Sequence, residues 1–488
     1  MEHFYGYIDK MQSLYSSSWK LTSLAYRLLI SKCNAFFTSI LYFLSISSLG
    51  FVMLKSCNPR TTSYAPSNID LLFTSVSAAT ASSMMTVEME VFSQQQLIVM
   101  TALMLLGGEI FTSICFTAKP SSDHQIHDLS RSLTLRNDSI KYLGILVLGY
   151  VAVIQILGVA SLLTYLSLVS SAGSVLRRKG IKPSIFAVFT IVSTFANCGF
   201  IPTNENLIVF SGNTGLLLIL IPQILLGNTL FPLALRGVIW GLGKRFKRNE
   251  AEYLLRNSRE VGFPHLLPRR ESLLLAATAV GFVFAASVLF SAMEWYAVGL
   301  DGLNSYRKVV GVVFQCANAR HAGENIVDLS TIAPAVLLFF ILMMYLPPYT
   351  SFVPIKRGDQ VEDPSNSQEK EKRKRHILVD NFAFSQLSYV AIFIILICVT
   401  ERKSLKEDPI NFSVLNIAFE VISAYGNVGL TTGYSCDRQL RADPKCVSKW
   451  YGLAGKWSDE AKLILIVVMF YGRLKKFNIK GGRAWKLL

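Results

Sequence analysis

The sequence predicts an all-α membrane protein, in which four repeats of helix, short re-entrant segment and helix surround one central axis. Three observations lead to this fold class. The chain is unusually apolar, it holds eight long apolar stretches, and four similar short segments lie between those stretches. Together they predict both the class of the protein and the internal repetition of its fold.

Composition excludes the common soluble classes. The 488 residues are 51% hydrophobic and only 16% charged, and 48 Lys and Arg against 32 Asp and Glu give a net charge of +16. Soluble domains carry about 25% charged residues, so a chain this apolar would not stay dispersed in water. Disorder requires few apolar residues and a high charge density, and eight Cys are too few for a disulfide scaffold. An integral membrane protein remains.

Eight apolar stretches can cross a bilayer, whose hydrocarbon core requires about 20 residues of helix. They are 36–54, 95–117, 142–169, 214–235, 272–293, 331–350, 379–400 and 460–472 with its flanks. The eighth gives the weakest signal, because Lys462 begins it and Arg473 interrupts it.

The positions of the cations predict the orientation of these crossings. With both termini in the cytosol, the cytosolic segments hold 30 of the 48 Lys and Arg residues, as the bias of cytoplasmic loops towards cations requires. A short cationic run on the outer side is a local exception, namely Arg177, Arg178, Lys179 and Lys182. The first 35 residues lack the features of a cleavable signal, so the first crossing is expected to act as the targeting signal.

This topology divides the chain into four repeats joined by cytosolic loops. The expected boundaries are 1–35 for a cytosolic N-terminal segment, 36–117 for repeat A, 118–141 for a loop, 142–235 for repeat B, 236–271 for a loop, 272–350 for repeat C, 351–378 for a linker, 379–478 for repeat D and 479–488 for a C-terminal tail. Within the linker, residues 357–376 are polar and of mixed charge, which favours a disordered tether.

Two features of repeat D fall on the outer side. Cys436 and Cys446 share one loop and have the opportunity to pair, although their spacing alone leaves this open. Asn411 begins a glycosylation sequon, but it lies so close to the membrane that its modification is also left open.

The four short segments between paired crossings are copies of one pattern. They read LFTSVSAATASSM at 72–84, VFTIVSTFANCGF at 188–200, VFQCANARHAGEN at 313–325 and AFEVISAYGNVGL at 418–430. The second and fourth align without gaps on Gly199 and Gly429, with Phe ten positions earlier and Ser six positions earlier. The first fits the same frame with Ser83 in the glycine column, and the third, which diverges most, places Gly323 there.

Such segments are too short and too polar to cross the bilayer. Non-helical backbone at membrane depth persists only where it is buried in protein or lines a water-filled cavity. Each segment begins with about ten helix-compatible residues and ends in a turn of small residues. Four half-helix carboxyl ends, each equivalent to about half a negative charge, would then face one central pore, and four extended stretches would line it with carbonyl oxygens that replace the water of a cation.

Glycine suits the column because a turn that aligns successive carbonyls needs positive φ, which glycine adopts freely. The alternative is that these glycines serve tight helix packing or ordinary outer loops. Four copies in register, each between two crossings, favour the pore.

The same segments resemble the plant HKT transporters, relatives of the microbial Trk and Ktr potassium-uptake proteins. The strings that carry the resemblance are FTSVSAATASSM, VSTFANCGFIPTNEN, RHAGENIVDLS and SAYGNVGLTTGYSC, and the resemblance extends from about residue 36 to the end. It implies eight transmembrane helices, arranged as four helix–pore loop–helix repeats around one central pore, in a plasma-membrane homodimer with a separate pore in each protomer.

The resemblance also implies a set of site residues. Ser83, Gly199, Gly323 and Gly429 would be the selectivity filter, whose backbone carbonyls bind Na⁺. The filter would be flanked by Ser82, Asn197, Cys198, His321, Ala322, Asn427 and Val428. A Ser-Gly-Gly-Gly filter resembles the sodium-preferring branch of the family, whereas four glycines belong to the branch that also carries potassium.

A physical argument supports a sodium preference for Ser83. A Cβ at this position disfavours the left-handed backbone, so one of the four carbonyls would turn away and leave a poorer ligand set for the larger ion. Alternatively, Ser82 or Ser83 packs behind the filter and its hydroxyl replaces the missing ligand, with no change in preference.

Charged residues near the segments have two interpretations each. Arg473, inside the eighth crossing, corresponds to a family Arg that faces the pore as an electrostatic barrier, or else it snorkels to the cytosolic surface. Arg320 and Glu324 would either form an ion pair that supports the third segment or act as ion ligands. Glu88 and Glu205 follow the first two segments and would either concentrate cations at the outer mouth or cap helices.

Two smaller features complete this set. Asn197 leaves the filter neutral where an Asp would add negative potential. Pro334, Pro347 and Pro348 make the sixth crossing either breakable, as a gate requires, or merely kinked.

The favoured function is therefore a channel-like sodium uniporter, with a coupled Na⁺–K⁺ symporter or a K⁺ transporter as the alternative. A membrane-embedded enzyme is not supported, since the six His include no HExxH pair and the sequence has neither a GxSxG nor a phosphate-cradling glycine loop. We expect no cofactor and no nucleic-acid partner. Transporters with inverted halves are disfavoured, because the repeats return to the same orientation every two crossings.

Overall fold

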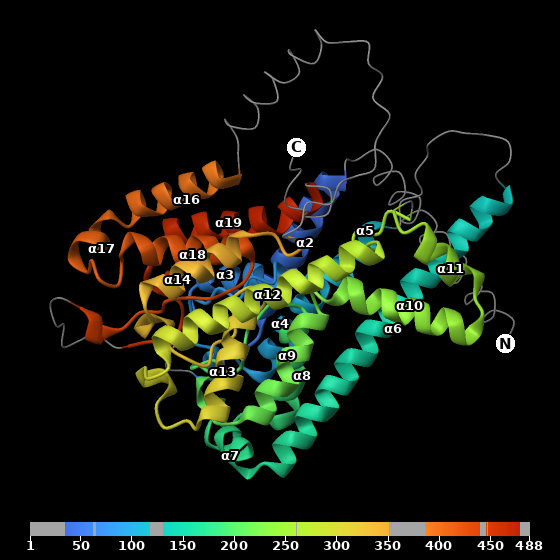
Figure 1. Cartoon of the computed structure of the whole chain (residues 1–488). Coiled ribbons are helices and arrows are strands. Elements are labelled where there is room, and N and C mark those ends of the chain that lie inside the picture. The colour runs from blue at the N-terminus through green and yellow to red at the C-terminus, as the bar shows by residue number, and fades with distance from the viewer. Residues whose placement is uncertain are drawn as a thin grey trace, which may run out of the picture.

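The computed structural model describes residues 35–61, 65–117, 130–259, 261–350, 386–439, 446 and 448–478. Across these residues the regular structure is helical, apart from one isolated β-bridge between Tyr434 and Lys449 (Figure 1). The predicted all-α class is confirmed. The expected N-terminal segment, the 357–376 linker and the C-terminal tail lie outside the described residues.

The first two repeats share a plan of long helix, short helix and bent helix. Repeat A consists of α2 (Ala35–Ser56), α3 (Asn68–Ala79), α4 (Gln94–Gly107) and α5 (Glu109–Thr117). Repeat B consists of α6 (Ser130–Leu168), α7 (Ser170–Arg178), α8 (Pro183–Phe195), α9 (Thr214–Leu226) and α10 (Phe231–Phe246), followed by α11 (Asn249–Arg256). Helices α10 and α11 therefore occupy part of 236–271, which the sequence predicts only as a loop.

Repeats C and D follow the same order, but in the described residues their last helix is not a bent pair. Repeat C consists of α12 (Arg269–Glu294), α13 (Ser305–Asn318) and α14 (Pro334–Tyr345). Repeat D consists of α16 (Gln386–Thr400), α17 (Arg402–Glu407), α18 (Val414–Gly426) and α19 (Asp459–Asn478). Short 3₁₀ turns follow the re-entrant segments, among them η1 (Met89–Val91), η2 (Ile208–Phe210), η4 (Leu329–Thr331) and η5 (Cys436–Arg438).

The short helices start where the sequence supplies a cap. Side chains of Ser67, Asn304 and Ser413 accept hydrogen bonds from the first turns of α3, α13 and α18, which satisfies donors that have no partner within the helix. Helix α8 begins instead with Pro183, whose fixed φ suits a first helical position. All four helices then bury their signature phenylalanine completely, at Phe73, Phe189, Phe314 and Phe419.

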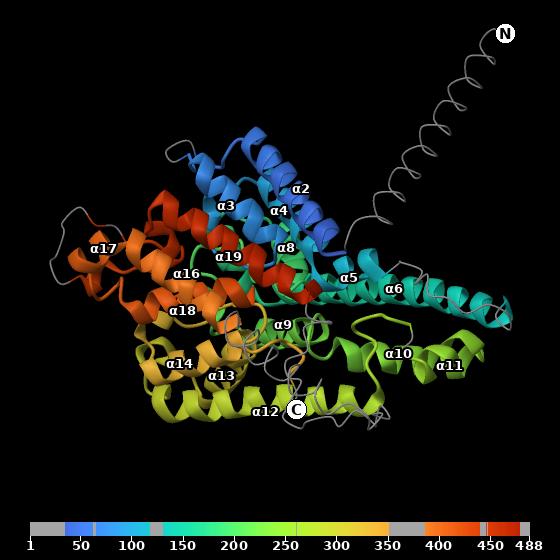
Figure 2. The same cartoon turned by 90° about the horizontal axis from the view of Figure 1, so that it is seen from above.

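The four repeats close into a ring. The last helix of each repeat packs on the short helix of the next: α4 on α8, α9 on α13, and α14 on α18. Helix α19, at the end of the chain, packs on α3 near its start. Viewed from above, α2 and α12 lie along opposite edges of the molecule with α19 and α9 between them (Figure 2). Short helices thus form the centre of a closed bundle.

Three helices in the described residues are long and apolar enough to cross a membrane, in α2, α6 and α12. Two further spans result if each bent pair is counted once, with a bend of 56° between α4 and α5 and of 81° between α9 and α10. The predicted stretch 95–117 is therefore broken at Gly107–Gly108, not continuous. The total of eight crossings stays a prediction.

Candidate functional site

The four predicted column residues adopt the same backbone conformation. The φ angles of Gly199, Gly323 and Gly429 are +89°, +71° and +94°, and that of Ser83 is +51°. Each residue lies three to five positions beyond the last residue of a buried short helix, and all four are buried. The left-handed turn that the repeat predicts is therefore present in every copy.

These four residues also lie next to one another. A Cβ at Gly199 would lie 1.6 Å from the carbonyl oxygen of Ala322, and a Cβ at Gly323 would lie 2.2 Å from that of Val428. The contacts between neighbouring repeats at these points are therefore backbone to backbone, with no space for a side chain.

The ring is closed through Ser83. A Cβ at Gly429 would lie 2.2 Å from Cβ of Ser83, and a Cβ at Gly199 would lie 3.3 Å from its hydroxyl oxygen. Repeat A thus contacts both D and B, and the order A, B, C, D around the ring follows the order in the chain. We refer to Ser83, Gly199, Gly323 and Gly429 as the filter ring.

Ser83 differs from the physical expectation in one respect. A Cβ was expected to keep it out of the left-handed region, yet its φ is +51°, and Ala81 two residues earlier has a φ of +52°. Burial and contacts with two neighbouring repeats hold the backbone there, at a cost of the order of 1 kcal/mol. What distinguishes Ser83 is therefore its side chain, whose buried hydroxyl has no hydrogen-bond partner among the described residues.

Two flanking asparagines connect the ring to the closing helices. Asn197 and Asn427 both have a φ of +53°, two positions before the column. The amide of Asn427 donates to the Ser82 hydroxyl at 2.8 Å and to the Met469 carbonyl of α19 at 3.1 Å. The amide of Asn197 donates to the carbonyls of Phe195 at 3.1 Å and, more weakly, of Ile224 at 3.4 Å.

Repeat C uses a different support at the same level. His321 has no left-handed backbone and is buried, with Nδ1 at 2.7 Å from the Ala317 carbonyl and Nε2 against the Thr229 hydroxyl of repeat B. The remaining flanking residues are buried apolar positions, namely Cys198, Ala322 and Val428. All seven flanking residues thus surround the ring.

Arg320 and Glu324 do not form the expected ion pair. Arg320 donates instead to the carbonyls of Met343 at 3.3 Å and Pro347 at 2.8 Å, and its guanidinium lies 4.8 Å from the Phe282 ring centroid. Glu324 accepts a hydrogen bond from Thr194 of α8. Arg320 offsets the partial negative charge at the carboxyl end of α14, whereas Glu324 binds α8. The two charges therefore stabilise different neighbouring helices.

Arg473 does not snorkel to the surface. It is 2% exposed, it donates to the Gly107 carbonyl, and its guanidinium lies 5.6 Å from the Phe43 ring centroid. Gly107 is the last residue of α4, immediately before the bend. A charge on α19 therefore satisfies the broken end of a helix in repeat A.

Sequence reasoning missed a second set of glycines, in the closing helices. A Cβ at Gly107, Gly227 or Gly472 would lie 1.9, 2.0 or 2.2 Å from the carbonyl oxygen four positions before the column of its own repeat. Only glycine permits this approach of a closing helix to the end of a short helix. Their distance in sequence from the column varies between repeats, so no fixed spacing signals them.

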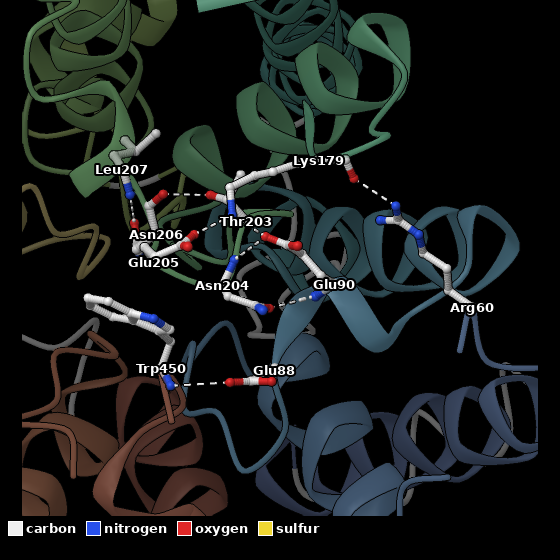
Figure 3. A network of polar contacts seen from close by, with 10 residues as sticks. All are labelled: Arg60, Glu88, Glu90, Lys179, Thr203, Asn204, Glu205, Asn206, Leu207 and Trp450. Carbon is white, nitrogen blue, oxygen red and sulfur yellow. Dashed lines mark hydrogen bonds and ion pairs between the residues drawn. The ribbon is translucent and has the colours of Figure 1, made fainter. Parts of the chain in front are cut away.

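The segments that lead from the filter ring to η1 and η2 are joined by charges (Figure 3). Lys179, beyond α7, lies 2.5 Å from Glu90 of repeat A and 2.5 Å from Glu205 of repeat B. Glu88 lies 3.5 Å from Lys449 of repeat D. Neither Glu88 nor Glu205 is free in the way that a cation-concentrating mouth requires, because each is paired with a lysine.

The loop that follows α18 bears on two points that the sequence leaves open. Cys436 and Cys446 form a disulfide. Asn411 is fully buried, and its amide nitrogen donates to Asp408 at 2.8 Å and to the Ser435 carbonyl at 3.0 Å. In this fold the atom that would carry a glycan is therefore not accessible.

The chain was also compared with known proteins. Residues 33–480 match the family model TrkH, described as cation transport protein. The chain is 44% identical to the cation transporter HKT1;3 of rice (Oryza sativa subsp. japonica), over 98% of this chain and 96% of that protein. It is 49% identical to the sodium transporter HKT1 of Arabidopsis thaliana, over 89% of this chain and 91% of that protein.

A solved structure has a similar fold. The potassium transporter TrkH from Vibrio parahaemolyticus superposes with a TM-score of 0.53 at 14% identity, over 91% of this chain and 84% of that one. The family model and the two plant relatives confirm the expected class of cation transporter, which is a family of transporters and not of enzymes.

Proposed function

The chain belongs to the TrkH family of cation transport proteins, and on that premise we propose that it is a sodium-selective, channel-like uniporter. In this proposal Na⁺ passes through the filter ring down its electrochemical gradient. The protein would act in the plasma membrane as a homodimer with one pore in each protomer and with both termini in the cytosol. The Arabidopsis relative named as a sodium transporter supports the choice of ion.

The closure of the filter ring is the observation that carries this proposal. Four left-handed residues from segments more than 100 residues apart meet, through backbone contacts between repeats B, C and D and through the Ser83 side chain at repeat A. Backbone carbonyls arranged in this way can replace the hydration shell of a cation. The carboxyl ends of α3, α8, α13 and α18 add partial negative charge on the same side of the ring.

The Ser83 side chain gives a physical reason for a sodium preference. Its Cβ contacts the backbone of Gly429 and its hydroxyl lies beside Gly199, so one side chain occupies space in a ring otherwise built of glycine. A ring narrowed on this side would favour the smaller ion. The unpartnered hydroxyl is a possible ligand as well, which is the second way for a serine to change the preference.

Two-electrode recording with external Na⁺ and K⁺ exchanged tests the proposal. The wild-type reversal potential should shift by about 59 mV for a tenfold change in external Na⁺ concentration. It should not change with the external K⁺ concentration. In Ser83→Gly, which removes the side chain and the backbone strain, K⁺ should become permeant.

Ser83→Ala separates bulk from ligand. Alanine keeps the Cβ that contacts Gly429 and tolerates this backbone, as Ala81 shows. Retained sodium selectivity would identify bulk as the cause, and loss of Na⁺ current would identify the hydroxyl. A wild-type potential that tracks K⁺ as well as Na⁺ would refute the sodium uniporter and favour a Na⁺–K⁺ symporter or a K⁺ transporter.

Arg473 keeps its predicted role as a pore barrier only as part of this proposal. Its burial and its bond to Gly107 support a fixed charge near the end of α4. A fixed cation close to the conduction path would slow the flow of Na⁺ by repulsion.

A further inference from the structure

The joint between repeats A and B carries a partly buried charge cluster above the filter ring. The Lys179 ammonium contacts Glu90 and Glu205 at 2.5 Å each, and the three side chains are only 17%, 23% and 23% exposed. Burial lowers the pKa of Lys179, but the hydrogen bonds that its ammonium donates to Glu205 and Glu90 outweigh this effect and raise the pKa above its ordinary value. The ammonium is therefore charged at physiological pH.

Both carboxylates belong to the segments that follow the filter ring in repeats A and B. Glu90 lies seven residues after Ser83, and Glu205 lies six residues after Gly199. A reciprocal pair of hydrogen bonds joins the same two segments. The backbone amide of Glu90 donates to Asn204 Oδ1 at 2.9 Å, and the backbone amide of Asn204 donates to Glu90 Oε1 at 3.1 Å (Figure 3).

The backbone of Lys179 is held in place by Arg60. Arg60 donates to the Lys179 carbonyl at 2.7 Å, and its own amide donates to the Val91 carbonyl at 2.8 Å. Lys179 thus has a fixed backbone as well as a fixed side chain. The cationic run that breaks the orientation rule contributes this residue to a specific contact between repeats.

The other joints above the ring are built differently. Between B and C, the Leu207 amide donates to the Asn325 carbonyl at 3.0 Å. Between D and A, the Gly452 amide donates to the Met85 carbonyl at 3.1 Å, and the nearby pair of Lys449 and Glu88 is longer, at 3.5 Å, and more exposed. Among the described residues, the A–B joint has one partly buried cation that lies within 2.5 Å of a carboxylate from each of the two repeats.

We propose that Lys179 is a positioning residue for ion selectivity. By holding Glu90 and Glu205 together, its ammonium fixes the spacing of the two chains that leave the ring. Ser83 and Gly199 face each other at the base of this same joint, so the clamp keeps the ring narrow on its serine side. The inference rests on the proposed function, because narrowness matters only if the ring selects the ion.

Loss of the ammonium would change the joint in a defined way. Two carboxylates left about 5 Å apart would repel each other, and the chains below them would separate. Potassium, the larger ion, would gain more from a wider ring than sodium. The effect requires the charge of Lys179 and not only its bulk.

The test is a measurement of the K⁺ to Na⁺ permeability ratio in Lys179→Met, which keeps the length of the side chain and removes its charge. We expect the ratio to rise roughly threefold to tenfold, and Lys179→Arg, which keeps the charge, to restore most of the selectivity. Arg178→Met is the matched control, since Arg178 is the adjacent exposed cation and forms no ion pair with the residues described. It removes the same charge from the neighbouring position, the last residue of α7, and should leave the ratio unchanged.

Each remaining outcome decides the question. If Lys179→Met reaches the surface with reduced current and an unchanged ratio, Lys179 is structural only and the inference is wrong. If the variant fails to reach the surface, Glu205→Gln, which removes one arm of the clamp, must raise the ratio in its place. A wild type that does not select Na⁺ would refute the proposed function and with it the premise of this inference, whereas a Na⁺-selective wild type with an unchanged ratio in Lys179→Met would refute the inference alone.

Discussion

At the scale of single residues, the hydrogen bonds and tertiary contacts of a side chain decide whether a sequence motif can function. Asn411 has the sequon that permits glycosylation, but its amide is buried and bonded on both sides. Ser83 lies in a column of glycines, yet it adopts the glycine backbone because neighbouring repeats hold it there. In both cases tertiary contacts override the local preference.

The Asn411 arrangement yields a prediction. Glycosidase treatment should leave the electrophoretic mobility of the expressed protein unchanged, because the amide nitrogen is not accessible after folding. Asn411→Gln should lower the free energy of unfolding of the purified protein by about 1–3 kcal/mol, since it leaves buried partners such as Asp408 without their hydrogen bond. A glycosidase shift in wild type that disappears in Asn411→Gln would contradict this account.

At the scale of elements, glycine permits close contact between a closing helix and the end of the short helix of the same repeat. Gly227, immediately after α9, allows the chain to touch the Phe195 carbonyl at the end of α8. We expect Gly227→Ala to destabilise the protein by at least about 1–3 kcal/mol, because its Cβ would lie 2.0 Å from that oxygen. The readout is the melting temperature in detergent together with the amount at the cell surface.

Gly237 provides the control for this prediction. It lies inside α10, and a Cβ there would meet no atom within 4 Å. Because alanine is the better helix former, Gly237→Ala should leave the melting temperature unchanged or raise it. Equal effects of the two substitutions would show that the contact at Gly227 is not limiting.

The sequence predicted the elements that repeat and missed those that do not. The column residues and the buried phenylalanines recur at nearly fixed spacing, so periodic comparison found Phe73, Gly199 and Gly429. The glycines of the closing helices recur at changing distances, because the outer loops differ in length. Partners such as that of Arg320 come from the end of α14, and no spacing within the motif predicts a contact with a distant helix.

At the scale of the whole molecule, the ring requires one joint that the chain does not make by continuity. Helix α19 must return to α3, and a buried pair marks this contact: Lys462 lies 2.9 Å from Asp70, with side chains 9% and 8% exposed. Lys462 weakened the prediction of the eighth crossing, because a charge inside an apolar stretch argues against a span. The structure gives it a partner 392 residues away.

This joint allows the closure of the ring to be tested as a property of the whole fold. Asp70→Asn leaves the Lys462 ammonium buried beside a neutral amide, and removal of one partner from a buried pair costs about 3–5 kcal/mol. The double variant Asp70→Asn with Lys462→Met removes both charges, so it should recover much of that loss. Melting temperatures in detergent should therefore be lowest for Asp70→Asn, intermediate for the double variant and highest for wild type. Because Asp459 lies 3.9 Å from the same ammonium and is largely exposed, Asp459→Asn serves as the control and should melt close to wild type. Additive losses in the double variant would mean that the two charges act independently and that this pair does not join the last repeat to the first.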